Sequence, residues 1–236
     1  MTNFTLERGA GPITLLRNHF RANRARLFHR HFAITAATTI LDLGGWDGAH
    51  LRGLLQGTAA QPENCHVADI DPTALERAAK TQGYNTHLLD AGGKLPFGER
   101  AFDIVFCSSV LEHVTISKAD IWRQRDGSMF RRESLVHQSA FATEIRRVGK
   151  GYFVQVPYRH FPIETHTWLP FFYYLPRPAQ IDVITATNKF WLKRTSPDFY
   201  LPTAGEFASF FPDGGIVRET MAGLIPKSLI AIRRSS

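Results

Sequence analysis

Three aspartates and a glycine-rich turn stand at the ends of short apolar runs in the first half of this 236-residue chain. The first run ends in Asp42-Leu43-Gly44-Gly45-Trp46-Asp47-Gly48, and Asp69 and Asp90 end the next two runs. Glycines let the backbone turn sharply and approach a ligand without interference from a Cβ atom. Asp69 follows Gly48 at about the 20-residue spacing at which a carboxylate binds ribose hydroxyls. The pattern therefore predicts a nucleotide-type site.

The glycine turn departs from the one that binds dinucleotides. In Gly-x-Gly-x-x-Gly the second glycine lets a pyrophosphate rest against the backbone, and here that position is Trp46. A bulky indole and the acidic Asp47 oppose a doubly anionic phosphate bridge, which argues against a nicotinamide oxidoreductase. They matter less for a ligand without phosphate, and S-adenosylmethionine is such a ligand.

The elements that must position these residues alternate between strand and helix. Apolar runs predict strands over 39–43, 65–68, 85–89, 102–107 and 152–156, and periodicity predicts helices over 50–55, 72–82 and 134–148. Asp71-Pro72 is typical of the N-cap and first turn of the second of these helices. The alternation predicts an α/β fold with a doubly wound, Rossmann-like, mostly parallel sheet. Two last strands, over 216–220 and 228–232, predict an antiparallel edge hairpin.

Three further segments complete a single predicted domain over 1–236. Residues 1–36 form an N-terminal helical cap, in which apolar residues recur at helical spacing between arginines. Either this helix packs on the domain with a solvated basic face, or it covers a ligand site or rests on a membrane surface. A basic insertion, 115–132, and an aromatic and proline-rich segment, 158–200, follow the fourth and fifth strands. Open α/β sheets hold their ligands at such strand ends.

Composition excludes several classes of protein. Hydrophobic residues make up 44% and charged residues 21%, as in a folded globular domain. The longest apolar run is too short to span a bilayer, and the N-terminus lacks a secretory pattern, so we expect a cytoplasmic protein. Cys65 and Cys107 lie in apolar runs and are expected to be core residues. No metal site is predicted, because the ten histidines show no His-x-x-x-His pattern with a nearby acid.

The ordered set of motifs resembles the class I S-adenosylmethionine-dependent methyltransferases. The matching stretches run in that family's order from about residue 39 to residue 156, half of the chain. They are Ile40-Leu41-Asp42-Leu43-Gly44-Gly45-Trp46-Asp47-Gly48, Ala68-Asp69-Ile70-Asp71-Pro72, Leu88-Leu89-Asp90-Ala91, Leu95-Pro96-Phe97, and Phe102-Asp103-Ile104-Val105-Phe106-Cys107-Ser108-Ser109-Val110-Leu111-Glu112-His113-Val114. The resemblance implies a transferase with S-adenosylmethionine as its cofactor.

The resemblance also implies roles for single residues. The methionine end of the cofactor would be held by Asp42, Gly44, Gly45 and Gly48. Asp69 with Ile70 would bind the ribose, Asp90 with Ala91 the adenine edge, and Ser108 with Val110 would line the cleft near the methyl group. Trp46 stands where the family usually has glycine, which puts the geometry of the methionine end in question. Asp42 and Asp90 could instead cap turns, and Asp71 is the rival ribose ligand.

The predicted chemistry is an in-line methyl transfer, in which alignment and exclusion of water supply much of the catalysis. If the acceptor is a hydroxyl, O-methylation needs a base, and His113 is the best placed candidate. Its alternative role is structural. On the aromatic segment, His160, Glu164, His166 and Trp168 are candidate acceptor-binding residues. This segment is either a lid or core under a long loop; a lid favours a small-molecule, lipid-linked or glycan-like acceptor.

Two rival functions remain. The net charge of +7 allows a nucleic-acid modifier or binder, but Ser108-Ser109 stands where a base amino methyltransferase carries Asn or Asp followed by Pro-Pro-Tyr. Nucleic acid is therefore disfavoured. The other rival is a catalytically silent domain that binds the cofactor or nothing. Without a membrane-spanning segment, only peripheral membrane contact is left open.

Overall fold

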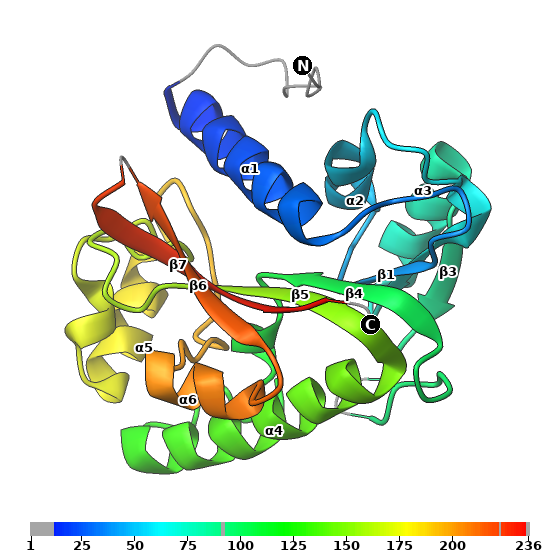
Figure 1. Cartoon of the computed structure of the whole chain (residues 1–236). Helices are drawn as coiled ribbons and strands as arrows, with labels where there is room; N and C mark the ends of the chain where they lie inside the picture. The colour runs from blue at the N-terminus through cyan, green and yellow to red at the C-terminus, as the bar shows by residue number, and fades with distance from the viewer. Residues whose placement is uncertain (1–11, 91–92, 222, 235–236) are drawn as a thin grey trace. The chain divides into compact units, whose positions relative to one another are not determined.

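The computed structural model of the chain describes residues 12–90, 93–221 and 223–234 (Figure 1). Its strands form a seven-stranded sheet in the order β3-β2-β1-β4-β5-β7-β6. The chain divides into two compact units. The first unit comprises residues 1–108, 146–154 and 232–236, and the second comprises residues 109–145 and 155–231. Each unit is described separately below.

Four strands of the first unit form its parallel core. They are β1 (Ile40–Leu43), β2 (Cys65–Asp69), β3 (Asn85–Leu88) and β4 (Phe102–Ser108). β1 pairs with both β2 and β4, with Ile40 opposite Cys65 on one side and Ile104 on the other. All four residues of β1 are buried, as expected for a central parallel strand that is covered on both faces. The pairing confirms the predicted doubly wound arrangement and brings the carboxyl ends of β1, β2 and β3 to one edge.

The described part of the first unit has three α-helices, α1 (Pro12–His31), α2 (Ala49–Leu55) and α3 (Pro72–Gln82), and one short 3-10 helix, η1 (Pro62–Asn64). Asp71 is the N-cap of α3, where its side chain accepts hydrogen bonds from the backbone of Thr73 and Ala74, and Pro72 opens the first turn. α3 ends at Gly83, which takes the left-handed conformation. The predicted start and end of this helix are therefore confirmed.

The N-terminal helix α1 buries more than apolar side chains. Phe28 is fully buried and meets the rings of Phe106 and Phe153 edge-on. Arg24 shares its face of the helix and is also buried, with 7% of its surface exposed. The expectation that the arginines of this helix form a solvated basic face is wrong for Arg24. The reason is the helical period, which places Arg24 four residues from both Phe20 and Phe28.

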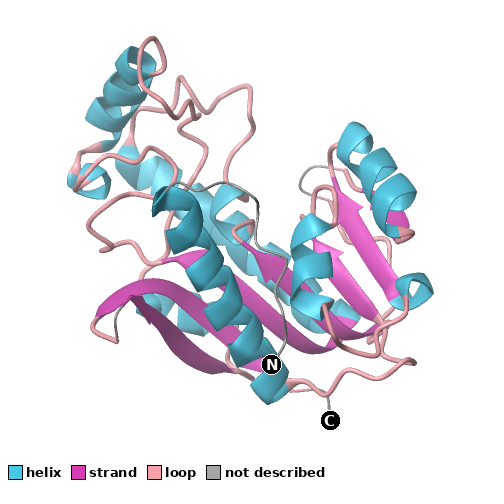
Figure 2. Ribbon diagram, turned by 90° about the horizontal axis from the view of Figure 1, so that it is seen from above, coloured by secondary structure: helices cyan, strands magenta, loops and turns pink. Residues whose placement is uncertain are grey.

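The second unit holds most of the remaining elements, joined by long loops (Figure 2). They are the short helix η2 (Leu111–His113), α4 (Gly127–Val148), η3 (Phe172–Tyr174), α5 (Arg177–Thr187) and α6 (Ala204–Phe210). α4 starts at Gly127 rather than near Ser134, because Asp126 Oδ1 caps it by accepting from the backbone of Ser128 and Met129. The end of the predicted basic insertion is thus the first turns of α4. The aromatic segment contains η3 and α5, which the prediction lacked.

Three strands complete the sheet, namely β5 (Gly149–Pro157), β6 (Gly215–Met221) and β7 (Ile225–Arg233). Only three residues separate β6 from β7. This connection is too short for the crossover that parallel strands need, so the two strands pair antiparallel. β6 is the last strand in the sheet order, so the predicted edge hairpin is confirmed.

The structure also tests the expectations that the cysteines are core residues and that no segment spans a membrane. Cys65 and Cys107 are both buried, as expected of small core residues. Within the described parts of the chain, no helix combines the length and the apolar character needed to cross a membrane.

Replacing the α3 cap should destabilise the fold without touching the glycine turn. We expect Asp71→Ala to cost about 1 kcal/mol, because two backbone N–H groups lose their acceptor, which lowers the thermal midpoint by roughly 2–4 °C. Asp71→Asn keeps an acceptor oxygen and should stay within about 0.5 kcal/mol of the wild type. Thermal unfolding followed by circular dichroism measures both, and an equal loss in the two variants would contradict the capping role.

Candidate active site

A buried carboxylate lies at the end of β1. Only 2% of Asp42 is exposed, and its Oδ2 atom has no hydrogen-bond partner among the described residues. The backbone of Gly45 lies directly against it, since a Cβ atom at Gly45 would stand 2.4 Å from both Cγ and Oδ2 of Asp42. Glycine is therefore required at position 45 by the carboxylate that the turn encloses.

Burial makes the charged form of Asp42 unfavourable. Desolvation, reinforced by the negative charge of Asp69, raises the pKa of Asp42 to about 8. A carboxylate that is unpartnered and desolvated in this way is stabilised by any cation that can reach it. The site thus favours a positively charged group beside Asp42.

The turn after β1 uses left-handed backbone at three positions. Gly44 and Gly48 have φ of 71°, and Trp46 has φ of 51°. A non-glycine residue in this region is strained, and Trp46 is held there because its N–H donates to Asp69 Oδ2 at 2.9 Å. Its indole is 54% exposed and lies against α3, with the Arg77 guanidinium 4.9 Å from the ring centroid. Trp46 therefore adopts the backbone conformation that glycine would supply.

The second predicted acid, Asp69, closes the turn. Besides the bond from Trp46, its Oδ1 accepts from the Asp71 N–H at 3.0 Å. Each carboxylate oxygen can accept a further hydrogen bond, so Asp69 is positioned by backbone and still able to bind hydroxyls. Its neighbour Ile70 is 47% exposed. Asp71, the rival candidate for the ribose ligand, instead uses its side chain to cap α3.

The third predicted acid lies at the end of the neighbouring strand. Leu89 N–H donates to the carbonyl of Asp69 at 2.9 Å, which joins the ends of β2 and β3. Asp90 follows with an exposed side chain. Ala91, its predicted partner in adenine binding, lies outside the described residues.

Helix α1 adds a cationic group that the sequence analysis did not assign to the site. Arg24 Nη1 donates to the Ser108 hydroxyl, at the end of β4, at 3.0 Å. Burial, together with the charges of Arg24 and Arg21, lowers the pKa of His50 to about 3 and keeps this ring neutral. The sequence does contain a pattern that indicates the burial of Arg24, because this residue lies four residues from both Phe20 and Phe28. An arginine on the apolar face of a helix is rare unless it is paired.

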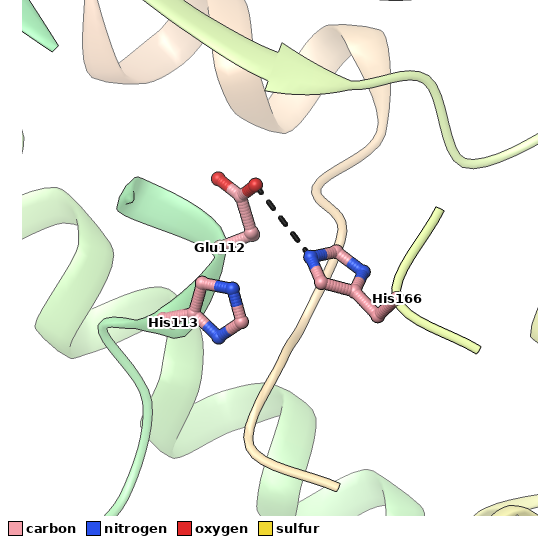
Figure 3. A group of neighbouring side chains, drawn as sticks. All are labelled: Glu112, His113 and His166. Atoms are coloured by element: carbon pink, nitrogen blue, oxygen red, sulfur yellow. Dashed lines mark ion pairs between the residues drawn. The ribbon is translucent and has the colours of Figure 1, made fainter. Parts of the chain in front are cut away.

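A second group of titratable side chains lies in the second unit, on η2 and on the loop over 163–170. Glu112 is fully buried, and neither of its carboxylate oxygens makes a hydrogen bond within the described parts of the chain. His166 Nε2 lies 3.8 Å from Glu112 Oε1 (Figure 3), and His166 Nδ1 lies 2.6 Å from Glu164 Oε1. Glu164 also accepts from the backbone of His166 and from both donors of Thr167. The Glu164 carboxylate therefore uses its hydrogen bonds to fix its own loop and the His166 ring.

His113 completes this group. Its Nδ1 lies 3.4 Å from Asp198 Oδ1, and its ring meets the His166 ring edge-on at 4.9 Å between centroids. The other face of His166 stacks on Phe199 at 4.2 Å. The imidazoles are thus held by packing as well as by carboxylates. Val110, predicted near the methyl group, accepts the His113 N–H at the start of η2.

The charges of this group depend on one another. Burial is the largest influence on His166 and favours its neutral form, but the nearby Glu112 and Glu164 carboxylates outweigh it and raise the pKa of His166 to about 9. For Glu164, burial opposes ionisation, yet its bonds to His166 and Thr167 lower the pKa of the carboxyl. His113 likewise lowers the pKa of Asp198 against the effect of burial.

Of the remaining predicted acceptor residues, Trp168 shares the loop of His166, and His160 lies in a separate contact. Trp168 belongs to the same loop, since its N–H donates to the Glu164 carbonyl at 2.8 Å, and its side chain is 37% exposed. His160 is exposed, and its Nδ1 is 2.8 Å from the Tyr174 hydroxyl. Sequence spacing could not join His166 to Glu112 and His113, because the three meet only through folding. Their ligand atoms lie within 4.8 Å of one another.

Asp42 should make stability depend on pH. A carboxyl whose pKa is raised from about 4 to about 8 holds its proton more tightly in the folded chain, so stability falls as pH rises through this interval. Asp42→Asn cannot ionise and should gain about 1 kcal/mol or more over the wild type between pH 4 and pH 9. Denaturant unfolding at several pH values measures this difference. Parallel stability curves for the two proteins would refute the assignment.

Part of the sequence matches a known protein family, and the fold is similar to that of solved structures. Residues 41–125 match the family model described as a methyltransferase domain. No curated protein sequence matches the chain. Three solved structures share the fold at low identity. A chain in the complex between the Haloferax volcanii Trm112 methyltransferase activator and a putative methyltransferase is 14% identical, with 93% of this chain and 90% of that one covered and a TM-score of 0.54.

The other two structures come from bacteria. An S-adenosylmethionine-dependent methyltransferase from Mesorhizobium loti is 14% identical, with coverage of 92% and 98% and a TM-score of 0.52. Magnesium protoporphyrin IX methyltransferase from Synechocystis PCC 6803, with bound SAH, is 13% identical, with coverage of 96% and 89% and a TM-score of 0.53. The family match lies over the glycine turn and the aspartates, and the fold around them agrees. Over residues 41–125 the chain is therefore similar to the methyltransferase-domain family, and the described fold is one that S-adenosylmethionine-dependent methyltransferases share.

Proposed function

We propose that this methyltransferase transfers the methyl group of S-adenosylmethionine to a hydroxyl of a small-molecule, lipid-linked or glycan-like acceptor. The observation that carries the cofactor half of the proposal is Asp42, a buried carboxylate whose Oδ2 has no hydrogen-bond partner among the described residues. The cofactor carries an ammonium group at its methionine end. Binding this cation beside Asp42 would favour loss of the carboxyl proton and formation of an ion pair.

The charges around the turn fit the rest of the methionine end. Arg24 reaches the end of β4, where it binds Ser108, and its guanidinium can pair with a carboxylate in the bidentate manner that arginine favours. Asp42 and Arg24 thus have the signs needed for the two ends of a zwitterionic amino acid. We propose that Gly44, Gly45 and Gly48 bring the backbone close to this group.

The adenosine half is assigned to the acids at the next two strand ends. Asp69 is fixed by two backbone N–H groups and keeps lone pairs for ribose hydroxyls. Ile70 is exposed beside it and offers an apolar surface. We assign Asp90 and Ala91 to the adenine edge from their place after β3.

S-Adenosylmethionine supplies a methyl group that is already activated by a sulfonium. The chain must then align an acceptor oxygen in line with the carbon–sulfur bond and remove the hydroxyl proton as the new carbon–oxygen bond forms. We propose that His113, which follows Ser108 and Val110 in the chain, acts on that hydroxyl. Asp198 lies 3.4 Å from its Nδ1 and orients the ring.

The aromatic segment supports an acceptor with apolar or ring character. Phe172 is buried with Ile184 and Phe199 and belongs to the core. Its neighbours Phe171 and Tyr174 are 65% and 62% exposed, so the segment is not core alone. Exposed aromatic side chains of this kind bind apolar and ring-containing ligands. We assign His160 and Trp168 to the acceptor side on this ground, with Glu164 and His166 as the groups that fix the loop.

Cofactor binding should depend on Arg24 and Asp69. In calorimetric titrations we expect S-adenosylmethionine and S-adenosylhomocysteine to bind and NAD not to bind. Arg24→Ala and Asp69→Ala should each weaken binding by about tenfold or more, because each removes a charge-assisted hydrogen bond. Arg26→Ala, on the exposed face of the same helix, is the matched control and should bind like the wild type. Unaltered affinity in Arg24→Ala would overturn the carboxylate assignment.

Methyl transfer should depend on His113 more than cofactor binding does. With tritiated S-adenosylmethionine and a panel of phenolic, glycan and polyprenyl-linked hydroxyl compounds, we expect His113→Ala to lower kcat by roughly a hundredfold or more. The Kd for the cofactor should change little. His160→Ala should instead raise KM if His160 contacts the acceptor. Methylation of amino or nucleic-acid acceptors in preference to hydroxyls would refute the acceptor class.

A further inference from the structure

We infer that Glu112, His113 and His166 form a binding site for one first-row divalent transition-metal ion. The three side chains come from two segments, η2 and the loop over 163–170, and turn toward a common point (Figure 3). Each offers one ligand atom, and all three atoms lie within 4.8 Å of one another. A metal bonded to imidazole nitrogen and carboxylate oxygen at about 2.0–2.2 Å would hold its ligands roughly 3–4 Å apart. The spacing therefore suits a shared ion after small side-chain movements.

Glu112 provides an independent reason to expect a cation. Its carboxylate is fully buried, and neither oxygen accepts a hydrogen bond from any residue that the structure describes. His166 Nε2 is the cationic group nearest to it in the described ion pairs, and at 3.8 Å it is beyond hydrogen-bond distance. Buried carboxylates are paired, hydrogen-bonded or bound to a metal. The distance leaves Glu112 incompletely satisfied by His166 alone.

The surroundings orient both imidazoles as metal ligands are oriented. Glu164 Oε1 lies 2.6 Å from His166 Nδ1, which leaves Nε2 directed at Glu112. Asp198 lies 3.4 Å from one nitrogen of His113. A carboxylate on the far nitrogen of a histidine fixes its tautomer and raises its strength as a ligand. Glu164 is itself held by Thr167 and by the His166 backbone, so the support is rigid.

The ligand set indicates the class of metal. Two nitrogens and one carboxylate favour Mn²⁺, Fe²⁺, Co²⁺ or Zn²⁺, whereas Ca²⁺ and Mg²⁺ prefer oxygen ligands throughout. Three protein ligands leave coordination positions open, as in sites that bind an exchangeable ligand. A metal-bound His113 would be a ligand rather than a proton acceptor, so metal binding also decides between these two roles.

The competing explanation is an ion cluster without metal. In that case protonated His166 neutralises Glu112 and Glu164, and the cluster only fixes the loop. The two explanations differ in a direct binding measurement that needs neither the methyl donor nor an acceptor.

The test uses the full chain after treatment with a chelator. Calorimetric titration with Zn²⁺ and Co²⁺ should show one ion per chain, and bound Co²⁺ should give visible absorption bands typical of nitrogen and oxygen ligands. Mg²⁺ should bind more weakly. Glu112→Gln and His113→Ala should each lower Co²⁺ affinity by about tenfold or more, since loss of even a supporting group has that effect. Glu164→Gln should lower it less than His113→Ala.

His160→Ala is the matched control, because His160 is an exposed histidine of the same unit that lies in a separate pair with Tyr174. It should bind Co²⁺ like the wild type. Circular dichroism and thermal unfolding establish that each variant is folded, and the metal should raise the thermal midpoint of the wild type more than that of His113→Ala. No stoichiometric binding, or equal affinity in wild type, Glu112→Gln and His113→Ala, would overturn the proposal.

Discussion

The desolvated carboxylate of Asp42 is the constraint on which the cofactor site depends. It lies on β1, a strand buried along its whole length, and burial is what raises its pKa. The turn that follows must accommodate this side chain, which is why position 45 has no room for a Cβ atom. A protein gains no stability from an ionised group in this condition. A cationic ligand would explain the arrangement, and S-adenosylmethionine, the proposed methyl donor, carries the required ammonium.

In the glycine turn, one hydrogen bond stabilises a left-handed backbone conformation at position 46 that usually requires glycine. Trp46 occupies left-handed backbone that glycine adopts more easily. The Asp69 carboxylate accepts the Trp46 N–H and thereby stabilises this conformation, while the indole lies on the Arg77 guanidinium. Asp69 therefore has a structural role in the turn in addition to its proposed role toward ribose. The two roles are compatible, because the backbone bonds use one lone pair on each oxygen.

The fold and the positions of the three aspartates at strand ends could be predicted from the sequence because both are local patterns. Strand and helix alternate with recognisable caps, and Asp42, Asp69 and Asp90 end successive strands, so parallel pairing alone brings them to one edge. The burial of Arg24 was not predicted in this way, because the many arginines of α1 favour an exposed basic face. The early start of α4 was missed because Asp126 caps a polar stretch with no apolar period. His166 could not be joined to Glu112, since folding alone brings the two together.

Asp42 and Glu112 are both buried carboxylates, and the chain treats them differently. Around Asp42 the neighbouring charge that acts on it is another carboxylate, so the proton is retained and a cation must come from a ligand. Near Glu112 the chain supplies its own imidazole, which is drawn toward the charged form by Glu112 and Glu164 together. An imidazole can give up its proton and offer nitrogen to a metal instead. Under the two proposals made above, the same physical problem has two solutions, in which Asp42 pairs with an organic cation and the Glu112 group exchanges a proton for a metal ion.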